Sequence, residues 1–146
     1  MCGLVAIISK RTSGMFQVDQ NIFKELLYAD AVRGWDATGV FGVNKHGNID
    51  IKKSAVAAGA FLISSEYNQF NNKLLTDYYM VVGHNRKATH GTKISENSHP
   101  FWSENEKIVL VHNGVVNNHN TLDKGHDVDS KAVCEAISKS ESILVS

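Results

Sequence analysis

The sequence predicts an α+β fold in which antiparallel strands pack against helices. Two short apolar runs rich in β-branched residues, Gly3–Ser9 and Tyr78–Gly83, have the composition of fully buried strands. Between them, Asp19–Val32 places apolar side chains three and four residues apart, as one face of an amphipathic helix does. Strands separated by helices in this way indicate a layered α+β architecture.

The first half of the chain is expected to contain a strand, a helix and a hairpin. Asp19 is a candidate N-cap for the helix that follows it. Val40–Asn44 and Asn48–Lys52 are predicted strands, and the three residues between them include Gly47, which favours a turn. We therefore expect a β-hairpin directly after the first helix.

The second half is expected to add a helical region, two strands and a long loop. Ser54–Asp77 is predicted to be helical, with an interruption near Asn68–Asn72. Lys107–His112 is a further buried strand after Tyr78–Gly83. The polar segment Asn85–Phe101 contains the only proline and is too long for a simple connection. We expect it to be a functional loop.

The composition predicts one cytoplasmic domain over residues 1–146. Fifteen basic and fifteen acidic side chains balance, so no overall field attracts nucleic acid or an anionic membrane. No apolar run approaches the roughly 20 residues that a membrane span requires, and the opening apolar run is too short for a secretory signal. We expect neither nucleic acid nor a membrane as a partner.

The two cysteines are expected to be free thiols with different roles. Cys134 lies in Ser130–Ser138, where apolar residues recur at helical spacing, and is predicted to be a buried small hydrophobe. Cys2 becomes the first residue if Met1 is removed, which small second residues generally permit. It would then carry a thiol nucleophile and an α-amine of pKa about 7.7 to 8.0, suited to a general base. Position alone favours the interpretation of Cys2 as a small buried side chain.

Other segments supply the remaining parts for amide hydrolysis through an acyl-enzyme. Asn113 and Gly114 end an apolar strand, where a side-chain amide and a backbone N–H can point at a developing oxyanion. The same dipeptide also favours a tight hairpin turn. Arg86 offers a planar fork for a carboxylate and Asp129 a charge for an ammonium, so together they could hold a free amino acid. Taken singly, each residue is more typical of a structural or solvated charge.

Metal and nucleotide sites are not indicated by the sequence. Four histidines cluster in the central third, but their spacing matches no helical His pair or finger-like ligand set. The two cysteines form no Cys-x-x-Cys, and no glycine-rich phosphate loop occurs. We predict no metal and no cofactor. The clustered histidines are His84, His90, His99 and His112.

Five blocks in order along the chain form a pattern far more specific than any one of them. The blocks are Met1–Val5, Arg33–Gly39, Gly83–Gly91 followed by Asn97–Phe101, Val111–His119, and Asp127–Ser130. Together they resemble the class II glutamine amidotransferases, the N-terminal-nucleophile glutaminase domains exemplified by that of glucosamine-6-phosphate synthase. The match covers most of the chain.

The resemblance implies an N-terminal-nucleophile αββα sandwich of antiparallel sheets, shortened here at its C-terminus, because relatives continue through further strands. It also implies glutamine hydrolysis through a glutamyl thioester. Cys2 would attack the side-chain amide while its α-amine relays the proton, and Asn113 with the Gly114 N–H would form the oxyanion hole. Ammonia would pass to a separate acceptor or partner, such as a synthase or acceptor-binding subunit, because the chain has no synthase domain.

The resemblance assigns substrate-binding and supporting roles to further residues. Arg86 would hold the α-carboxylate of glutamine and Asp129 its α-ammonium. Thr89 and His90 would complete the substrate-binding loop. The supporting residues near Cys2 would be Arg33 and Gly34.

Two features keep alternatives open. Lys87 stands where many relatives have an aromatic or other large residue in the loop that closes over glutamine, so lid closure or the choice of amide substrate could differ. An intact Met1 would block the proposed base. The alternative function is therefore a catalytically degenerate amidotransferase-fold protein that acts as a binding or regulatory module.

Overall fold

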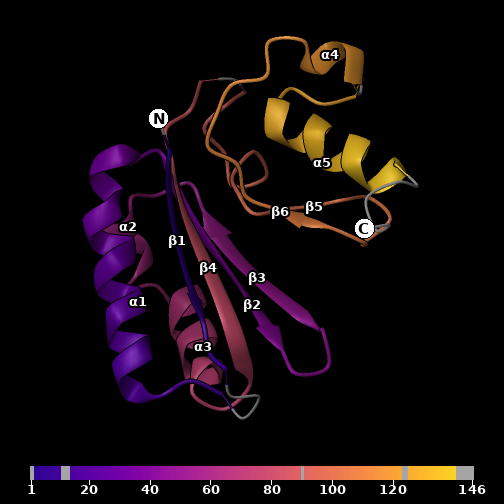
Figure 1. Ribbon diagram of the computed structural model, residues 1–146. Helices are drawn as coiled ribbons and strands as arrows, with labels where there is room; N and C mark the ends of the chain where they lie inside the picture. Colours follow the sequence, from indigo (N-terminus) through magenta and orange to yellow (C-terminus); the bar gives the residue numbers. More distant parts are fainter. Residues whose placement is uncertain (1, 11–13, 90, 123–124, 141–146) are drawn as a thin grey trace.

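The computed structural model describes residues 2–10, 14–89, 91–122 and 125–140. In this part of the chain, helices combine with a four-stranded and a two-stranded antiparallel sheet, which confirms the predicted α+β class (Figure 1). The strands are β1 (Gly3–Ile8), β2 (Ala37–Asn44), β3 (Ile49–Ser54), β4 (Tyr78–Arg86), β5 (Phe101–Trp102) and β6 (Val109–Leu110). The helices are α1 (Gln17–Ala29), α2 (Ala58–Phe61), α3 (Ser65–Leu74), α4 (His119–Leu122) and α5 (Asp129–Lys139), with a 3₁₀ turn, η1, over Asp30–Arg33.

Strand β4 organises the larger sheet, whose order is β1-β4-β2-β3. Its antiparallel register places Gly3 opposite Asn85 and Ala37 opposite Arg86. The beginnings of β1 and β2 therefore meet the end of β4 at one edge of the sheet. The chain enters β1 at this edge, so Cys2 lies beside the last residues of β4.

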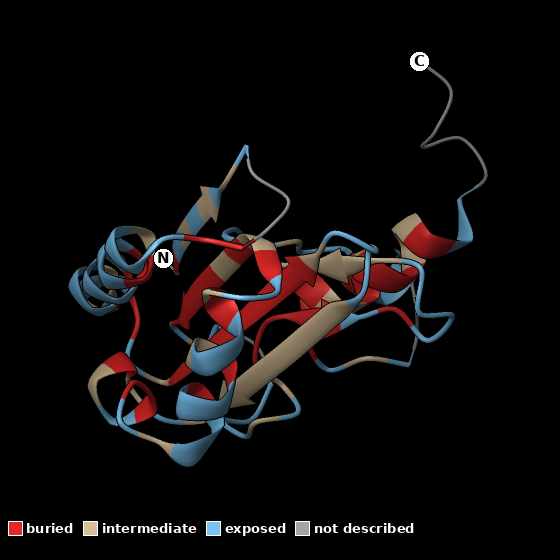
Figure 2. Cartoon of the chain, turned by 90° about the horizontal axis from the view of Figure 1, so that it is seen from below, coloured by how far each residue is buried: buried red, intermediate tan, exposed pale blue. Residues whose placement is uncertain are grey.

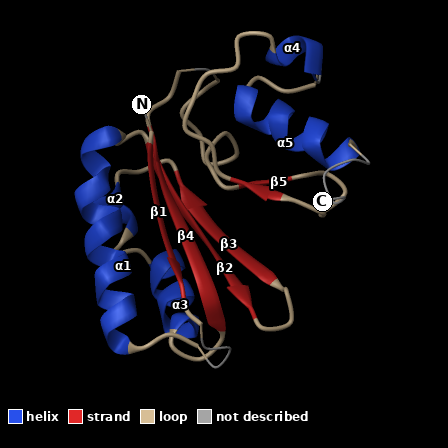
Figure 3. Ribbon diagram, viewed as in Figure 1, coloured by secondary structure: helices blue, strands red, loops and turns tan. Residues whose placement is uncertain are grey.

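One face of the larger sheet packs against α1, α2 and α3 (Figures 1 and 3). Figure 2 shows buried residues concentrated along the sheet, whereas the outer surfaces of the helices are exposed. Phe23 and Leu27 of α1 are fully buried against Val40 and Val81 of the central strands. The spacing of these two side chains by four residues is the helical periodicity that the sequence displayed.

The smaller sheet forms a second core with α5. Phe101, Val128 and Cys134 are buried together, and Ile108 and Leu110 pack against them. Figure 3 shows α5 beside β5, on the side of the molecule away from α1. The predicted burial of Cys134 in a helix is confirmed, and both cysteines are free thiols. The full αββα sandwich and its C-terminal shortening stay predictions.

Two predictions about the first elements are wrong. Strand β1 is an edge strand rather than a fully buried one, because it pairs only with β4 in the described residues. Leu4 and Ile8 are 41% and 66% exposed, because only the opposite face of the strand, with Val5 and Ile7, packs against the helix–sheet core. Helix α1 begins at Gln17, so Asp19 is not its N-cap. Its carboxylate instead accepts the N–H of Phe16 at 2.8 Å, in the first turn.

The predicted helical region and the last predicted strand differ from the structure in their bounds. The helical region divides between α2 and α3 rather than at Asn68–Asn72, which lie inside α3. Ser64 causes the division, because its Oγ accepts the N–H of Tyr67 at 3.2 Å and caps a new helix. Within Lys107–His112 only Val109–Leu110 is a strand, and it is half-buried.

The hairpin β2–β3 and the strand over Tyr78–Gly83 are confirmed, and β4 extends to Arg86. Among the described helices, none is long and apolar enough to cross a membrane.

The helix–sheet core gives a matched test of stability. Leu27→Ala should lower the free energy of unfolding by about 2–5 kcal/mol, because it leaves a cavity against the sheet. Leu26→Ala, at the neighbouring position that is 44% exposed, should cost about 1 kcal/mol or less. Urea unfolding of both variants measures the difference. Equal losses would contradict the assignment of this helix face to the core.

Candidate active site

Cys2 is held at the edge of the larger sheet by residues from three other segments. Its backbone N–H donates to Asn113 Oδ1 at 2.9 Å, and its carbonyl oxygen accepts from Arg33 Nε at 3.0 Å. Its Sγ accepts the N–H of Lys87 at 3.3 Å. These contacts join the end of η1, the loop after β4 and the loop after β6 at one residue.

Asn113 and Gly114 lie beside Cys2, as predicted, on the loop that follows β6. Asn113 uses its carbonyl oxygen toward Cys2, so its side-chain NH₂ group is directed by that bond and has donors to offer elsewhere. A Cβ atom on Gly114 would lie 2.6 Å from Nε2 of His112. A side chain at position 114 would therefore displace the ring of His112.

A small cavity that is partly open to solvent lies beside Cys2. Arg86 and Asp129, two residues predicted to hold an amino acid, are both part of its wall and are each only 3% exposed. Burial lowers the pKa of Arg86, and the neighbouring Cys2, Asp36 and Asp129 oppose that shift. The cavity thus combines a thiol with one buried cation and one buried anion. Its wall comprises Cys2, Arg86, Lys87, Thr89, His99, His112, Gly114, Val128, Asp129 and Ser130.

Asp129 is positioned by the start of α5 and by the loop after β6. Its Oδ2 accepts the N–H of Val116 at 2.9 Å, and its Oδ1 accepts the N–H of Ser130 at 2.8 Å. As the first residue of α5, its carboxylate also lies at the positive end of the helix dipole. The ring of His112 reaches the same place, with Nδ1 3.0 Å from Ser130 Oγ. The Asn113–Gly114 loop and Asp129 therefore form one connected unit.

Asp36 orders the loop that carries Arg86 and Lys87, although no individual role was predicted for it. Its Oδ2 accepts the N–H of Ala88 at 2.9 Å, and its Oδ1 pairs with Lys93 Nζ at 2.6 Å. The hydrogen bond from Lys93 lowers the pKa of Asp36. The one sequence feature that could have identified Asp36 was its place in the Arg33–Gly39 block.

Gly34 lies against the same loop. A Cβ atom there would be 2.6 Å from the backbone nitrogen of Lys87, so a side chain would displace the loop that contacts Cys2. Lys87 itself is exposed, and its Nζ lies 5.4 Å from the centroid of the Trp35 ring. This cation–π contact links the two loops at the mouth of the cavity.

Three histidines that the sequence suggested only as poor metal ligands support the floor of the site. The rings of His84 and His99 stack with centroids 3.9 Å apart, and His84 Nε2 lies 3.1 Å from the carbonyl oxygen of His112. Both ring nitrogens of His99 are buried without a hydrogen-bond partner in the described residues. Burial lowers the pKa of His84 to about 4 and also lowers the pKa of His99.

Lys53 of β3 fixes the segment that carries His99. Its Nζ donates to the carbonyl oxygens of Ser98 at 2.7 Å and Pro100 at 3.0 Å. Burial lowers the pKa of Lys53 to about 8. A Cβ on Gly39 would clash with the carbonyl oxygen of His99, so the absence of a side chain there admits this segment onto the sheet.

The structure brings most of the predicted site residues together. Thr89 is exposed at the rim of the cavity, and Arg33 and Gly34 contact Cys2 and its neighbouring loop. His90 lies outside the described residues. Asp36, Lys53 and Ser130 are supporting residues for which no individual role was predicted, and His99 was considered only as a metal ligand.

We compared the chain with known proteins to identify its relatives. No family model matches it. The isomerizing glutamine–fructose-6-phosphate aminotransferase of Sulfurisphaera tokodaii is 29% identical over 143 residues, which are 94% of this chain and 22% of that protein. The corresponding aminotransferases of Bacteroides thetaiotaomicron and Buchnera aphidicola are 31% and 35% identical over 122 residues, 84% of this chain and 18% of each relative. The chain is a relative of the class II glutamine amidotransferases. It spans about a fifth of the length of the curated relatives it matches.

The buried histidines His84 and His99 predict that the free energy of unfolding of this amidotransferase relative decreases in acid. The unfolded chain binds their protons below about pH 6.5, whereas folded His84 does so only near pH 4, and the pKa of folded His99 is also lowered. Their contribution to stability is thus complete above about pH 6.5 and is lost as the pH falls toward about 4. Urea unfolding across this range should show a decreasing free energy of unfolding.

The His99→Leu variant separates this effect from general acid unfolding. It should reduce the pH slope of the unfolding free energy by about 1 kcal/mol per pH unit, because one of the two histidines no longer titrates. His46→Leu, which removes an exposed histidine from the β2–β3 turn, is the matched control and should leave the slope unchanged. An unaltered slope in His99→Leu would contradict the assignment.

Proposed function

We propose that residues 1–146 form a glutaminase domain that hydrolyses the side-chain amide of glutamine through a thioester on Cys2. The observation that carries the proposal is the arrangement of one cavity. A thiol, a buried guanidinium and a buried carboxylate share its wall, and an Asn-Gly pair adjoins the thiol. Free amino acids offer the matching charges, because their α-carboxylate and α-ammonium have opposite signs.

The buried charges would fix glutamine in a single orientation. Arg86 would bind the α-carboxylate and Asp129 the α-ammonium, with Thr89 and His90 completing the binding loop. With both α-substituents held, the side chain of glutamine would extend toward Cys2. The proposed role of Arg33 and Gly34 is to hold the backbone around Cys2, consistent with their contacts to Cys2 and the Lys87 loop.

The proposed reaction begins once Met1 has been removed. The Cys2 amine takes the thiol proton as Sγ attacks the amide carbon, and a tetrahedral oxyanion forms. The Asn113 side-chain NH₂ and the Gly114 N–H would donate to that oxygen. The amine then protonates the leaving nitrogen, ammonia departs, and the glutamyl thioester remains. Water, deprotonated by the same amine, cleaves the thioester and yields glutamate and the free thiol.

Ammonia produced in this way needs an acceptor. The relatives are named for amino transfer between glutamine and fructose 6-phosphate, and each is about five times as long as the aligned segment. We propose that this chain delivers ammonia to a separate synthase or acceptor-binding domain or subunit. The proposed chemistry uses the thiol, amine and backbone groups of the chain and requires no cofactor.

Cys2→Ala should abolish both glutamate release and formation of the glutamyl thioester. Cys134→Ala, which removes the buried thiol of α5, is the matched control and should keep the activity. Glutamate release is measured together with the intact mass of the protein before and after a glutamine analogue that traps thiols. The mass also reports whether Met1 has been removed.

Absence of both glutamate and trapped thiol in protein that lacks Met1 would refute the proposal. Binding of a partner that survives Cys2→Ala in such inactive protein would instead support a regulatory module. Glutamate analogues that fail to compete with the true substrate would indicate another amide, with Lys87 as the residue that alters the choice.

Asn113→Ala should reduce kcat about 10²- to 10³-fold, because it removes one proposed oxyanion donor. Asn117→Ala changes an exposed asparagine on the same loop and should leave kcat close to that of the unmodified protein. Steady-state glutaminase assays of both variants make the comparison. A loss confined to KM in Asn113→Ala would show that the residue acts in binding rather than on the oxyanion.

A further inference from the structure

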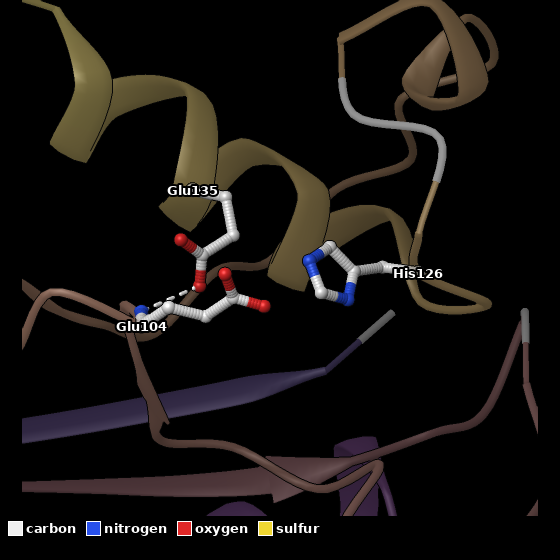
Figure 4. A group of neighbouring side chains, drawn as sticks. All are labelled: Glu104, His126 and Glu135. Carbon is white, nitrogen blue, oxygen red and sulfur yellow. Dashed lines mark hydrogen bonds between the residues drawn. The ribbon is translucent and has the colours of Figure 1, made fainter.

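Three side chains able to bind a metal ion converge away from the candidate active site (Figure 4). Glu104 follows β5, His126 precedes α5, and Glu135 lies within α5. One potential ligand atom from each side chain lies within 4.8 Å of the other two. Figure 4 shows the two carboxylates and the imidazole directed toward a common space between the turn after β5 and helix α5.

Glu135 contributes a buried carboxylate to this group. Glu135 is only 1% exposed, and its side chain makes one hydrogen bond, in which Oε1 accepts the N–H of Glu104 at 2.8 Å. Within the described residues, neither Glu104 nor Glu135 forms an ion pair with lysine or arginine. A buried carboxylate beside a second carboxylate is unfavourable unless a cation or a proton accompanies it.

We propose that Glu104, His126 and Glu135 bind a divalent transition-metal ion, with Zn²⁺ as the best match. Imidazole nitrogen and carboxylate oxygen are both common zinc ligands, whereas Mg²⁺ and Ca²⁺ prefer oxygen alone. Zinc lies about 2.0–2.2 Å from such ligands, so ligand atoms on one ion are at most about 4.4 Å apart. The present separations of up to 4.8 Å would have to shorten, for which the exposed Glu104 side chain would rotate, and water would complete the coordination.

The position of the ion indicates a structural rather than a catalytic role. It would connect the turn after β5 and the segment before α5 to the helix itself. The same helix begins with Asp129, which forms part of the cavity beside Cys2. Metal binding would therefore stabilise the placement of α5, while the chemistry proposed at Cys2 proceeds without a metal.

Zn²⁺ binding to the full chain tests this site directly. Isothermal titration with Zn²⁺ is performed on chelator-treated protein in a Cys2→Ala background, so that the thiol cannot bind the ion. We expect one saturable site per chain. Glu135→Gln and His126→Gln should each weaken the binding about tenfold or more, since even partners outside the ligand set commonly contribute about 10- to 100-fold.

Two matched variants control for general effects of charge and histidine content. Glu106→Gln changes an exposed glutamate in the same turn as Glu104, and His46→Gln changes an exposed histidine distant from it, so both should bind Zn²⁺ normally. Zn²⁺ should also raise the Tm of the Cys2→Ala protein and of both controls, but not that of Glu135→Gln.

Several results would overturn the proposal. One is the lack of saturable Zn²⁺ binding, and another is equal affinity for Ca²⁺ and Zn²⁺. A third is unchanged Zn²⁺ affinity in the ligand variants, because the ion would then bind elsewhere. If Glu135→Gln does not fold, Zn²⁺ binding is measured with Glu104→Gln, which changes the exposed ligand. Normal Zn²⁺ affinity in that variant would contradict the proposed site. Glutaminase activity is assayed separately, so failure of the metal site and failure of the proposed reaction are distinguished.

Discussion

The antiparallel pairing of β4 with both β1 and β2 is the constraint on which the rest of the site depends. It aligns Gly3 with Asn85 and Ala37 with Arg86, so three chain segments reach the same sheet edge. A shift of β4 by one residue would exchange its two faces and turn Arg86 away from the cavity. The packing of Val81 against α1 opposes such a shift, and thereby couples the hydrophobic core to the placement of the charged groups.

The two faces of β4 also separate two environments. Asn85 points toward α1, where its Nδ2 donates to the carbonyl oxygen of Leu27 at 2.9 Å. His84 points to the opposite face and stacks on His99. The lowered pKa of both rings means that neither adds positive charge beside Arg86 near neutral pH. Arg86 is a buried cation of the cavity wall, whereas Lys87 in the same wall is exposed.

Much of the fold and of the candidate site followed from local patterns in the sequence. The hairpin β2–β3, strand β4 and the burial of Cys134 were predictable, because periodicity and turn residues act over short distances. The exposure of one face of β1 was not, since which face is covered depends on how the whole sheet packs. The N-cap Ser64 belongs to the short polar pair Ser64–Ser65, which is a weak helix-breaking signal. The asparagines at Asn68–Asn72 are a stronger signal, so the interruption was predicted too far along the chain.

Site residues were predictable where their chemistry was distinctive and were missed where they act through geometry. Cys2, Arg86, Asn113 and Asp129 carry groups that suit amide chemistry by type alone. Lys53 acts through two backbone carbonyls, a contact that no spacing along the chain reveals. The Glu104–His126–Glu135 group was likewise invisible, because its members come from a turn, a loop and a helix that only tertiary packing brings together.

The hydrogen bond between Cys2 and Asn113 has a consequence for the timing of maturation. Its partners are 111 residues apart in the sequence, so the bond forms only after most of the chain has been synthesised. In the folded protein, the backbone of Cys2 is engaged on both sides, by Asn113 and by Arg33. The proposed reaction requires removal of the initiator methionine, and that removal would meet the least hindrance on the nascent chain, before these contacts have formed.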